Sequence, residues 1–269
     1  MSSMHLRVLG PLEAVADEGT NIPLGGPKQR AVLGLLAAGE PHAIETDRLI
    51  EELWPDSVSE ANRKTVQAYV ARLRAAGLAD AIQSGPSGYR LDIDIVTIDA
   101  GEFEDALTRA RERLAVRPGE TADLLWDALR LWRGRPFEDA FQAAALELEV
   151  ARLEALRVVA YEAWAEASLA AGRHREILPD LRRIAEDYPL LEGLWASLIV
   201  AEYRSGRQAE ATASYAAVTR RLWDEVGVEP GSELADLHRR MLNQDPTLDP
   251  PPGAPRLVVP ARGLSEVPR

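Results

Sequence analysis

The stretch that decides the fold lies at residues 61–74 and reads ANRKTVQAYVARLR. It is rich in helix-forming residues and carries four basic side chains, in a chain whose formal net charge is -12. Val66, Val70 and Leu73 recur at helical spacing, so we expect them to face the core. The stretch is therefore predicted to be an amphipathic helix with a basic outer face. A face distinct from the buried stripe carries Lys64, Gln67, Ala71 and Arg74, with Arg63 and Arg72 at its margins.

A second basic element follows this helix closely. Residues 83–90 read QSGPSGYR, and the Gly and Pro residues at their centre predict a tight hairpin with a basic tip. A basic helix followed by such a hairpin is typical of a winged helix-turn-helix, in which the helix enters the major groove of DNA and the wing lies beside it.

The charge balance of this region differs from that of the whole chain. Residues 63–90 carry five basic residues against a single acidic one, Asp80, which gives a local balance of +4. The positive field is thus confined to one surface, while the rest of the chain should repel DNA, a distribution that favours a single docking orientation.

Composition excludes several other classes. The 269 residues contain no cysteine, so disulfides, thiolate metal sites and cysteine nucleophiles are ruled out. The sequence has no apolar run of membrane-spanning length and no signal peptide at its start, which predicts a cytoplasmic, nucleoid-associated protein with no membrane partner. The four histidines are scattered without ligand spacing, and we find no enzyme signature; the expectation is no catalytic residue, no metal and no cofactor.

Residues 4–97 are predicted to form the winged helix with small β-sheets. Short strands are expected at 6–9, 12–15, 21–24 and 92–96, and helices at 29–38, after Pro27, and from Thr46, which is predicted to cap its helix. Gly25–Arg30 lacks the spacing of a phosphate-binding loop, so a turn before a helix is expected there; helix-start amides that touch a DNA phosphate are the weaker alternative.

Residues 99–243 are predicted to be an all-α, tetratricopeptide-like domain. Gly172 and Arg173 recur 34 positions later as Gly206 and Arg207, and 34 is the period of that repeat. A groove lined by Tyr203 and Tyr215 could bind a partner segment. Trp126, Trp132, Trp164 and Trp195 lie on apolar helical stripes and are expected in the core. The tail at 244–269 is rich in proline and is predicted to be a linker or a flexible end. The helices are expected near 102–116, 121–132, 142–171, 174–187, 192–205, 208–226 and 232–242.

The basic region suggests a mechanism of DNA contact. Arg72 and Gln67 are expected to reach base edges, because arginine suits guanine and glutamine suits adenine. Lys64, Arg74 and Arg90 are expected to bind phosphates, which fix register without carrying sequence information. The predicted set of DNA-binding residues is Arg63, Lys64, Gln67, Arg72, Arg74, Ser87 and Arg90.

With these residues in hand, the chain resembles the SARP (antibiotic regulatory protein) family of actinobacterial transcriptional activators over nearly all of residues 4–243. Residues 6–10, 47–54, 65–74 and 88–90 resemble the OmpR-type winged helix. Residues 128–134, 203–211 and 227–231 resemble the bacterial transcriptional activation domain.

The resemblance implies binding to direct repeats that overlap the -35 region of promoters, and recruitment of RNA polymerase through its sigma factor and alpha subunit. It places Lys64, Arg72, Arg74, Ser87 and Arg90 at DNA-contacting positions. Ala71 stands where such domains often carry another basic residue.

The prediction is therefore a sequence-specific activator of secondary-metabolite or regulatory genes that binds double-stranded DNA as a side-by-side homodimer. Two alternatives stay open: a protein-interaction adaptor whose winged helix binds protein, and a ligand-gated repressor.

Overall fold

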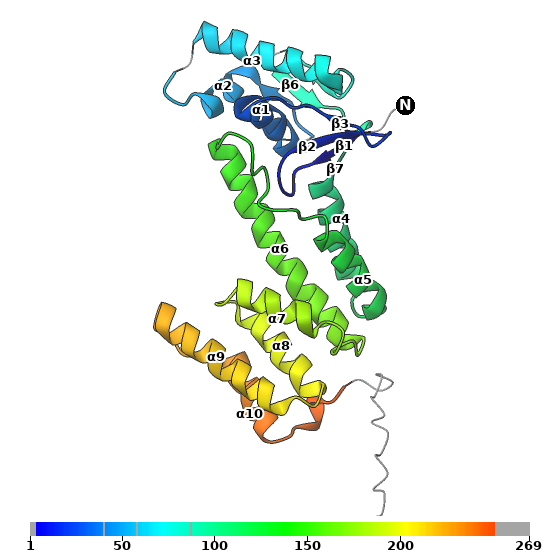
Figure 1. Cartoon of the computed structure of the whole chain (residues 1–269), viewed down its shortest axis with the longest axis vertical. Helices are drawn as coiled ribbons and strands as arrows, with labels where there is room; N and C mark the ends of the chain where they lie inside the picture. The colour runs from blue at the N-terminus through cyan, green and yellow to red at the C-terminus, as the bar shows by residue number, and fades with distance from the viewer. Residues whose placement is uncertain (1–3, 40, 58, 87, 251–269) are drawn as a thin grey trace, which may run out of the picture. The chain divides into compact units, whose positions relative to one another are not determined.

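The computed structural model describes residues 4–39, 41–57, 59–86 and 88–250. These residues form two compact units (Figure 1). Unit 1 comprises the chain up to Val116 together with Asp123–Ala163, and unit 2 comprises Arg117–Ala122 and the chain from Trp164 onward. Helices α5 (Pro118–Leu129) and α6 (Ala144–Ala170) each contribute residues to both units.

The elements of unit 1 begin with two small sheets. The first has the strand order β3-β2-β1-β7, with β1 antiparallel to β2 and parallel to β7, and the second has the order β4-β6-β5. Three helices, α1, α2 and α3, pack against one another, and a single π-helical turn, η1 (Arg74–Leu78), follows the third. The bounds are β1 (Met4–Arg7), β2 (Glu13–Ala16), β3 (Asn21–Ile22), α1 (Pro27–Ala38), β4 (Ile44–Glu45), α2 (Thr46–Leu53), α3 (Glu60–Leu73), β5 (Ile82–Ser84), β6 (Gly88–Leu91) and β7 (Val96–Ile98).

Three sequence expectations for these elements need correction. Thr46 is the first residue of α2 rather than its cap, because Glu45 still has the extended backbone of a strand residue. The strand expected at 92–96 lies instead at β7, since the backbone N–H groups of Ile95 and Val96 donate to the carbonyl of Asp92 and close a turn. The first strand is likewise β1, at residues 4–7, because the amides of Val8 and Leu9 donate to the carboxylate of Asp99 instead of to a neighbouring strand.

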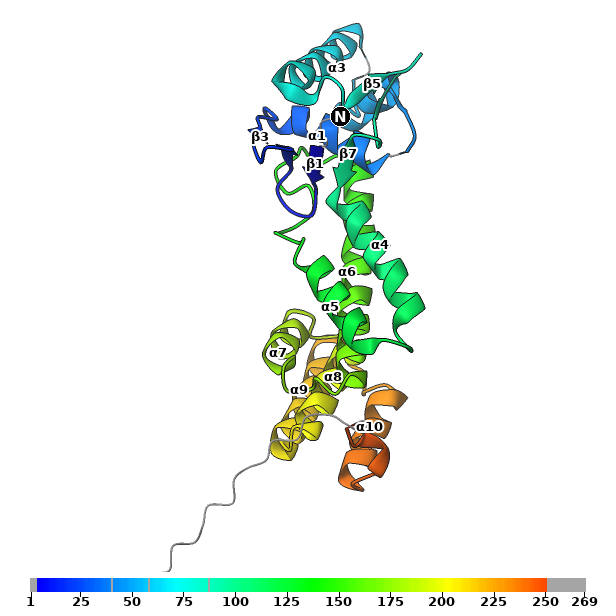
Figure 2. The same ribbon diagram turned by 90° about the vertical axis from the view of Figure 1, so that its right-hand side faces the viewer.

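The remaining part of unit 1 is helical. Helix α4 (Asp99–Arg113) runs beside α6 in both views (Figures 1 and 2), and the guanidinium of Arg152 on α6 pairs with Glu104 on α4 at 2.7 Å. Helix α3 lies at the end of unit 1 remote from α4, so its outer face is clear of these helices.

The winged helix is fastened to this helical part at a contact region that we call the junction, formed by residues 8–12, Asp99 and residues 133–141. The backbone N–H of Arg133 donates to the carbonyl of Leu9 at 2.7 Å, and that of Phe137 donates to Val8 at 3.0 Å. Gly34 on α1 leaves room for Phe137, because a Cβ there would lie 3.1 Å from its ring. The sequence boundary at 97–99 thus falls inside one compact unit, in which the winged helix and α4 share contacts.

The junction also carries charges. The carboxylate of Asp139 accepts from the backbone N–H of Leu12 and from the guanidinium of Arg30, both at 2.8 Å. Nearby, the carboxylate of Glu52 on α2 accepts from the backbone N–H of Ala145 at the start of α6, at 2.9 Å. Each bond ties the winged helix to a residue more than 90 positions away along the chain.

Unit 2 contains α7 (Leu178–Asp187), α8 (Glu192–Arg204), α9 (Gln208–Val226), α10 (Ser232–Leu242) and the short 3-10 helix η2 (Pro246–Leu248). The predicted 34-residue repeat is visible in its turns. Gly172 and Gly206 have φ of 74° and 78°, the left-handed conformation that glycine adopts without strain. The N–H groups of Arg173 and Arg207 then donate to the carbonyls of Ser168 and Glu202, which are also 34 residues apart. Local sequence therefore sets equivalent helix ends in both repeats.

Long-range contacts in unit 2 include a buried acid. The carboxylate of Glu202 on α8 accepts from Arg182 on α7 at 2.6 Å and from the hydroxyl of Ser214 on α9 at 3.1 Å. Burial raises the pKa of Glu202, although Ser214 and Arg182 act in the opposite direction. This cluster fixes three helices against one another.

Some helix bounds and the start of the tail also differ from expectation. Helix α7 begins at Leu178 rather than at 174, because residues 174–177 form turns before Pro179, which sits in the first turn of the helix. The chain from 244 to 250 is not an extended tail, since Asp245 caps η2 and the carbonyl of Leu248 accepts from the guanidinium of Arg204 at 2.9 Å. Residues 251–269 lie outside the described residues. The overall prediction, a mainly α protein with small N-terminal sheets and tetratricopeptide-like helices, is confirmed.

The described residues lack two features of other classes of protein. No helix among them is long and apolar enough to cross a bilayer. They also contain no group of three or more His, Cys, Asp or Glu side chains arranged to hold a metal ion.

Candidate nucleic-acid interface

Helix α3 has the amphipathic character that its sequence predicts. Its start is capped by Ser59, whose hydroxyl accepts from the backbone N–H of Asn62 at 3.2 Å. Val66, Val70 and Leu73 are fully buried, so the orientation of the helix is fixed by its apolar stripe. The outer face of α3, which we define as Lys64, Gln67, Ala71 and Arg72, is exposed.

The polar side chains of this outer face carry hydrogen-bond donors that a ligand could use. Lys64, Gln67 and Arg72 have no hydrogen bond or ion pair with any other residue that the structure describes. An ammonium, an amide and a guanidinium therefore stand on one exposed helix face with their donors directed to solvent. This is the arrangement that reading phosphates and base edges requires.

Arg63 and Arg74, in contrast, are engaged with the protein. The guanidinium of Arg63 pairs with the carboxylate of Asp47 on α2 and lies 3.7 Å from that of Glu60. Arg74 donates to the carbonyl of Ile82 through Nε at 3.1 Å and Nη2 at 2.8 Å, and Nη2 also donates to the hydroxyl of Ser84 at 2.9 Å. Arg63 thus ties α3 to α2, and Arg74 ties its C-terminal end to the wing.

The hairpin of the wing is confirmed, but its tip is not basic. β5 and β6 pair antiparallel with Gln83 opposite Arg90, so Arg90 lies in a strand. Its Nε and Nη2 atoms donate to Oε1 of Gln83 at 2.9 and 2.6 Å. Arg90 is nevertheless exposed. Ser87, the other predicted contact of the wing, lies outside the described residues.

The base of the wing is the point where β6 approaches β4 closely. A Cβ on Gly88 would lie 1.9 Å from the carbonyl oxygen of Ile44, so only glycine allows β6 to pair with β4 at this point. This glycine anchors the wing to the strand that precedes α2, and thereby to the helix-turn-helix.

The helix-start alternative at Gly25–Arg30 receives little support from the side chains. The ammonium of Lys28 donates to the carbonyl of Leu53 at 2.9 Å and lies over the rings of Trp54 and Phe141, at 4.3 and 4.8 Å from their centroids. The ammonium group of Lys28 is therefore engaged with partners inside the fold and is not available to a ligand.

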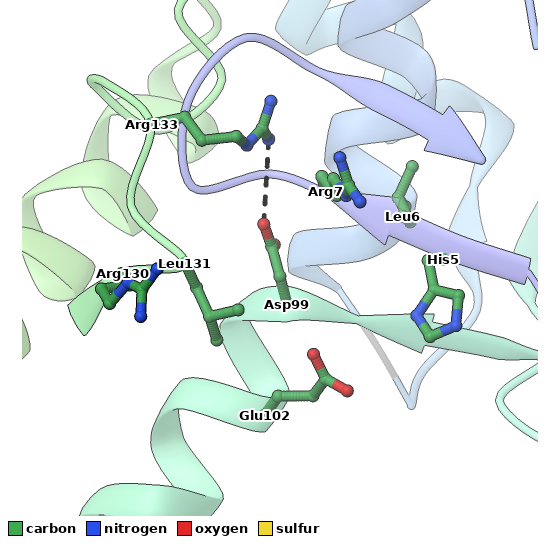
Figure 3. Close-up of a pocket in the computed structure, with 8 residues that line it drawn as sticks. All are labelled: His5, Leu6, Arg7, Asp99, Glu102, Arg130, Leu131 and Arg133. Atoms are coloured by element: carbon green, nitrogen blue, oxygen red, sulfur yellow. Dashed lines mark ion pairs between the residues drawn. The ribbon is translucent and has the colours of Figure 1, made fainter. Parts of the chain in front are cut away.

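Sequence reasoning missed the charged residues of the junction, of which Figure 3 shows Asp99 and Arg133. Asp99 is only 6% exposed and accepts from the N–H groups of Val8 and Leu9 at 2.7 and 3.3 Å. Its carboxylate points toward Arg133, 3.8 Å away (Figure 3). Burial raises the pKa of Asp99 to about 6, against the lowering effect of those two amides and of Arg133. The side chains border a cavity of about 400 Å³ that is also lined by Arg7, Glu102 and Arg130.

No local pattern marks Asp99 as buried, because its partners precede it by about 90 residues. The only available signal was that an aspartate follows a strand at the start of a helix, which usually indicates an exposed cap.

Comparisons with known proteins agree with this architecture. The family model for the bacterial transcriptional activator domain matches residues 98–242. Transcriptional regulatory protein EmbR of Mycobacterium tuberculosis is 36% identical over 246 residues, which cover 89% of this chain and 63% of EmbR. Regulatory protein DnrI of Streptomyces peucetius is 32% identical over 260 residues, which cover 91% of this chain and 94% of DnrI. Transcriptional regulator RedD of Streptomyces coelicolor is 32% identical over 264 residues, which cover 92% of this chain and 73% of RedD.

The fold is shared as well. The solved structure of Mycobacterium tuberculosis EmbR in complex with a low affinity phosphopeptide matches with a TM-score of 0.81 and 33% identity, covering 90% of this chain and 65% of that one. The chain thus spans somewhat less than two thirds of the length of EmbR. Since a family model covers more than half of the chain and relatives cover nearly all of it, the chain belongs to the bacterial transcriptional activator domain family, within the SARP-type transcriptional regulators.

Proposed function

We propose that this protein is a sequence-specific DNA-binding transcriptional activator in which α3 enters the major groove. The observation that carries the proposal is the outer face of α3, where Lys64, Gln67 and Arg72 are exposed and without partners among the described residues. In a chain of net charge -12, such a face is a specific site for a polyanion rather than part of a generally basic surface.

The partners of each basic side chain within the protein suggest how that side chain contributes to DNA binding. Gln67 and Arg72 read base edges, and Lys64 neutralises a phosphate. Arg90 contacts a phosphate of the adjacent backbone through its Nη1 group, which makes no hydrogen bond to Gln83. Arg63 and Arg74 take part chiefly by holding α3 against α2 and the wing, because their guanidinium groups are already engaged there.

The domain assignment follows from these roles. Residues 4–97 bind DNA, and residues 99–243 mediate pairing of two chains and touch RNA polymerase through its sigma factor and alpha subunit. Two chains side by side occupy direct repeats near the -35 region, so both copies of α3 face the same side of the duplex. The named regulators among the relatives and the family match support this assignment.

Selection of bound fragments from genomic DNA, followed by footprinting at about 150 mM salt, tests the proposal, because non-specific phosphate binding is weak at that ionic strength. We expect enrichment of direct repeats about one helical turn apart, just upstream of promoters. A matched pair of variants sharpens the test. Arg72→Ala should lose the enrichment, whereas Arg183→Ala, which removes an exposed arginine of α7, should keep it.

Failure has a distinct signature. Binding that is abolished by salt and enriches no sequence would leave only a basic patch. In that case the adaptor alternative would be favoured, and the partners of the helical half would be sought by cross-linking.

A further inference from the structure

Unit 2 carries an apolar groove that none of the roles above explains. Residues of α9, of α10 and of the turn between them line it, its volume is about 600 Å³, and most of its surface is apolar. Its walls include Trp223, which is 62% exposed, and Val228, which is 45% exposed. Pockets that bind small molecules have volumes of about 300–1,000 Å³ and are mostly apolar, with a few polar groups that orient the ligand. The size and the lining of the groove therefore indicate a small-molecule site.

Aromatic side chains give the groove two flat surfaces. The ring of Tyr215 on α9 stacks on that of His238 on α10, with centroids 3.8 Å apart and planes 10° from parallel. Trp223 follows Tyr215 on the same helix by eight positions, which is about 12 Å at the helical rise. Tyr215 was expected from the sequence to line a groove, whereas Tyr203 is not among the lining residues. Because aromatic faces pack well against other flat rings, the groove favours a planar aromatic ligand.

The end of the groove at Trp223 is electronegative. Gly227, with φ of 73°, caps the end of α9, and the N–H groups of Gly227 and Val228 donate back to the carbonyls of Trp223 and Leu222 at 3.0 and 3.3 Å. The next residue, Glu229, therefore lies beside the last turn of α9, where the helix dipole places partial negative charge. Its carboxylate has no hydrogen bond or ion pair with any other residue that the structure describes. A cationic group of a ligand would meet this carboxylate and the face of Trp223, and tryptophan is the ring that binds cations most strongly.

One lining residue, Arg220, has the opposite charge. It precedes Trp223 by about one helical turn, and its exposed side chain also has no partner in the part of the chain that the structure describes. An arginine at such a position packs its methylene groups on the wall and keeps its guanidinium in water. The chain as a whole has a net charge of -12, and the local excess of basic residues lies at 63–90 in unit 1. The long-range field at unit 2 therefore also favours a cation.

We propose that this groove binds a planar aromatic cation, a small molecule with fused aromatic rings and a protonated amine. Its ring system packs on the stacked pair of Tyr215 and His238. Its cationic group lies beside Trp223 and Glu229. The site belongs to unit 2 and does not involve the outer face of α3, so it is independent of the proposed DNA contacts.

Proflavine, a three-ring aromatic cation, is the probe. The full chain, freed of nucleic acid, is titrated by isothermal calorimetry with proflavine and, separately, with 9-anthracenecarboxylate, a three-ring anion of similar shape. We expect saturable binding of one proflavine per chain, at least tenfold tighter than the binding of the anion. Added salt should weaken the binding of proflavine, because it screens the attraction to Glu229.

Variants of the lining residues locate the site. Trp223→Ala should weaken the binding of proflavine at least tenfold, and Glu229→Gln should weaken it several-fold and reduce its dependence on salt. Arg220→Gln should strengthen it, because a like charge is removed. The matched controls are Leu148→Ala and Glu112→Gln, an exposed apolar residue and an exposed acid of unit 1, and both should bind as the wild type does.

Three outcomes would overturn the proposal. Absence of saturable binding, or equal affinity of the wild type and Trp223→Ala, would show that the groove does not hold the probe. Tighter binding of the anion would show that Arg220, and not Glu229, sets the charge of the ligand. A dimer in light scattering that dissociates in Trp223→Ala would assign the groove to a second copy of the chain. Failure of the DNA-binding proposal is separable, because Arg72→Ala should bind proflavine as the wild type does.

Discussion

The outer face of α3 and the junction both carry charged side chains in unit 1. They differ in whether those side chains have hydrogen-bond or ion-pair partners within the protein. On α3, Lys64 and Arg72 are exposed and have no partner among the described residues. At the junction, Arg30 pairs with Asp139, and Asp99 accepts two backbone amides and faces Arg133. Exposed surface charges without partners contribute little to stability, whereas breaking a buried arrangement leaves uncompensated polar groups. The comparison separates residues that bind from residues that hold the fold.

The largest effect is expected at the junction. Asp99→Ala leaves the amides of Val8 and Leu9 buried without an acceptor. Each such group costs about 1–3 kcal/mol, so we expect a loss of about 2–6 kcal/mol of unfolding free energy. Urea denaturation at pH 7 measures it. Glu102→Ala, at an exposed position of the same helix, is the control. A change below about 0.5 kcal/mol, the usual size of a surface effect, would make Asp99 equivalent to a surface charge and erase the contrast with α3.

Asp99 also gives the junction a pH dependence. Its pKa is raised to about 6 in the folded state, so between pH 4 and 6 the native protein binds a proton that the unfolded chain has lost. The part of its contribution that depends on protonation is therefore absent at neutral pH, appears as the pH falls through 6 and is complete near pH 4. Relative to Asp99→Asn, which does not titrate, the wild-type protein should gain up to about 3 kcal/mol from pH 7 to pH 4. Parallel stability curves for the two proteins would contradict the raised pKa.

The outer face of α3 should respond in the opposite manner. Arg72→Ala should leave thermal stability unchanged and reduce discrimination between specific and non-specific DNA by about 1–3 kcal/mol, if the guanidinium reads a guanine. Fluorescence anisotropy with both DNAs measures the difference. Equal losses on the two would reassign Arg72 to a phosphate.

The smallest effect is expected at the wing. Arg90→Ala should weaken binding to any sequence and make the slope of log K against log salt shallower by about 0.9, the value for one phosphate contact. Titrations between low and physiological salt determine the slope. Gln83→Ala, which frees Arg90 from its hydrogen bonds without removing its charge, should keep the slope of the wild type; an identical slope in Arg90→Ala would exclude the wing from the contacts.

Features with short-range causes were predictable from the sequence. The stripe of Val66, Val70 and Leu73 orients α3, and the glycines at 172 and 206 end two helices in the same way, because burial periodicity and turn chemistry depend on near neighbours. The hairpin of the wing follows from its central Gly and Pro residues for the same reason.

The candidate site was predictable only in part. The sequence named every basic residue near α3 but could not separate Arg72, which has no partner among the described residues, from Arg74, which is bound to the carbonyl of Ile82 in the next element. That distinction needs the position of the wing relative to the helix, which no periodicity contains.

The sequence by itself determined the helices, the wing, the repeat and the basic character of α3, since each depends on residues within a few turns of one another. Only the tertiary structure decided that Asp99 is buried under the strands of the winged helix and that Trp223 is left exposed in a groove. The physical reason is that burial of a polar or an aromatic side chain depends on partners distant in the chain, and helical spacing carries no information about them.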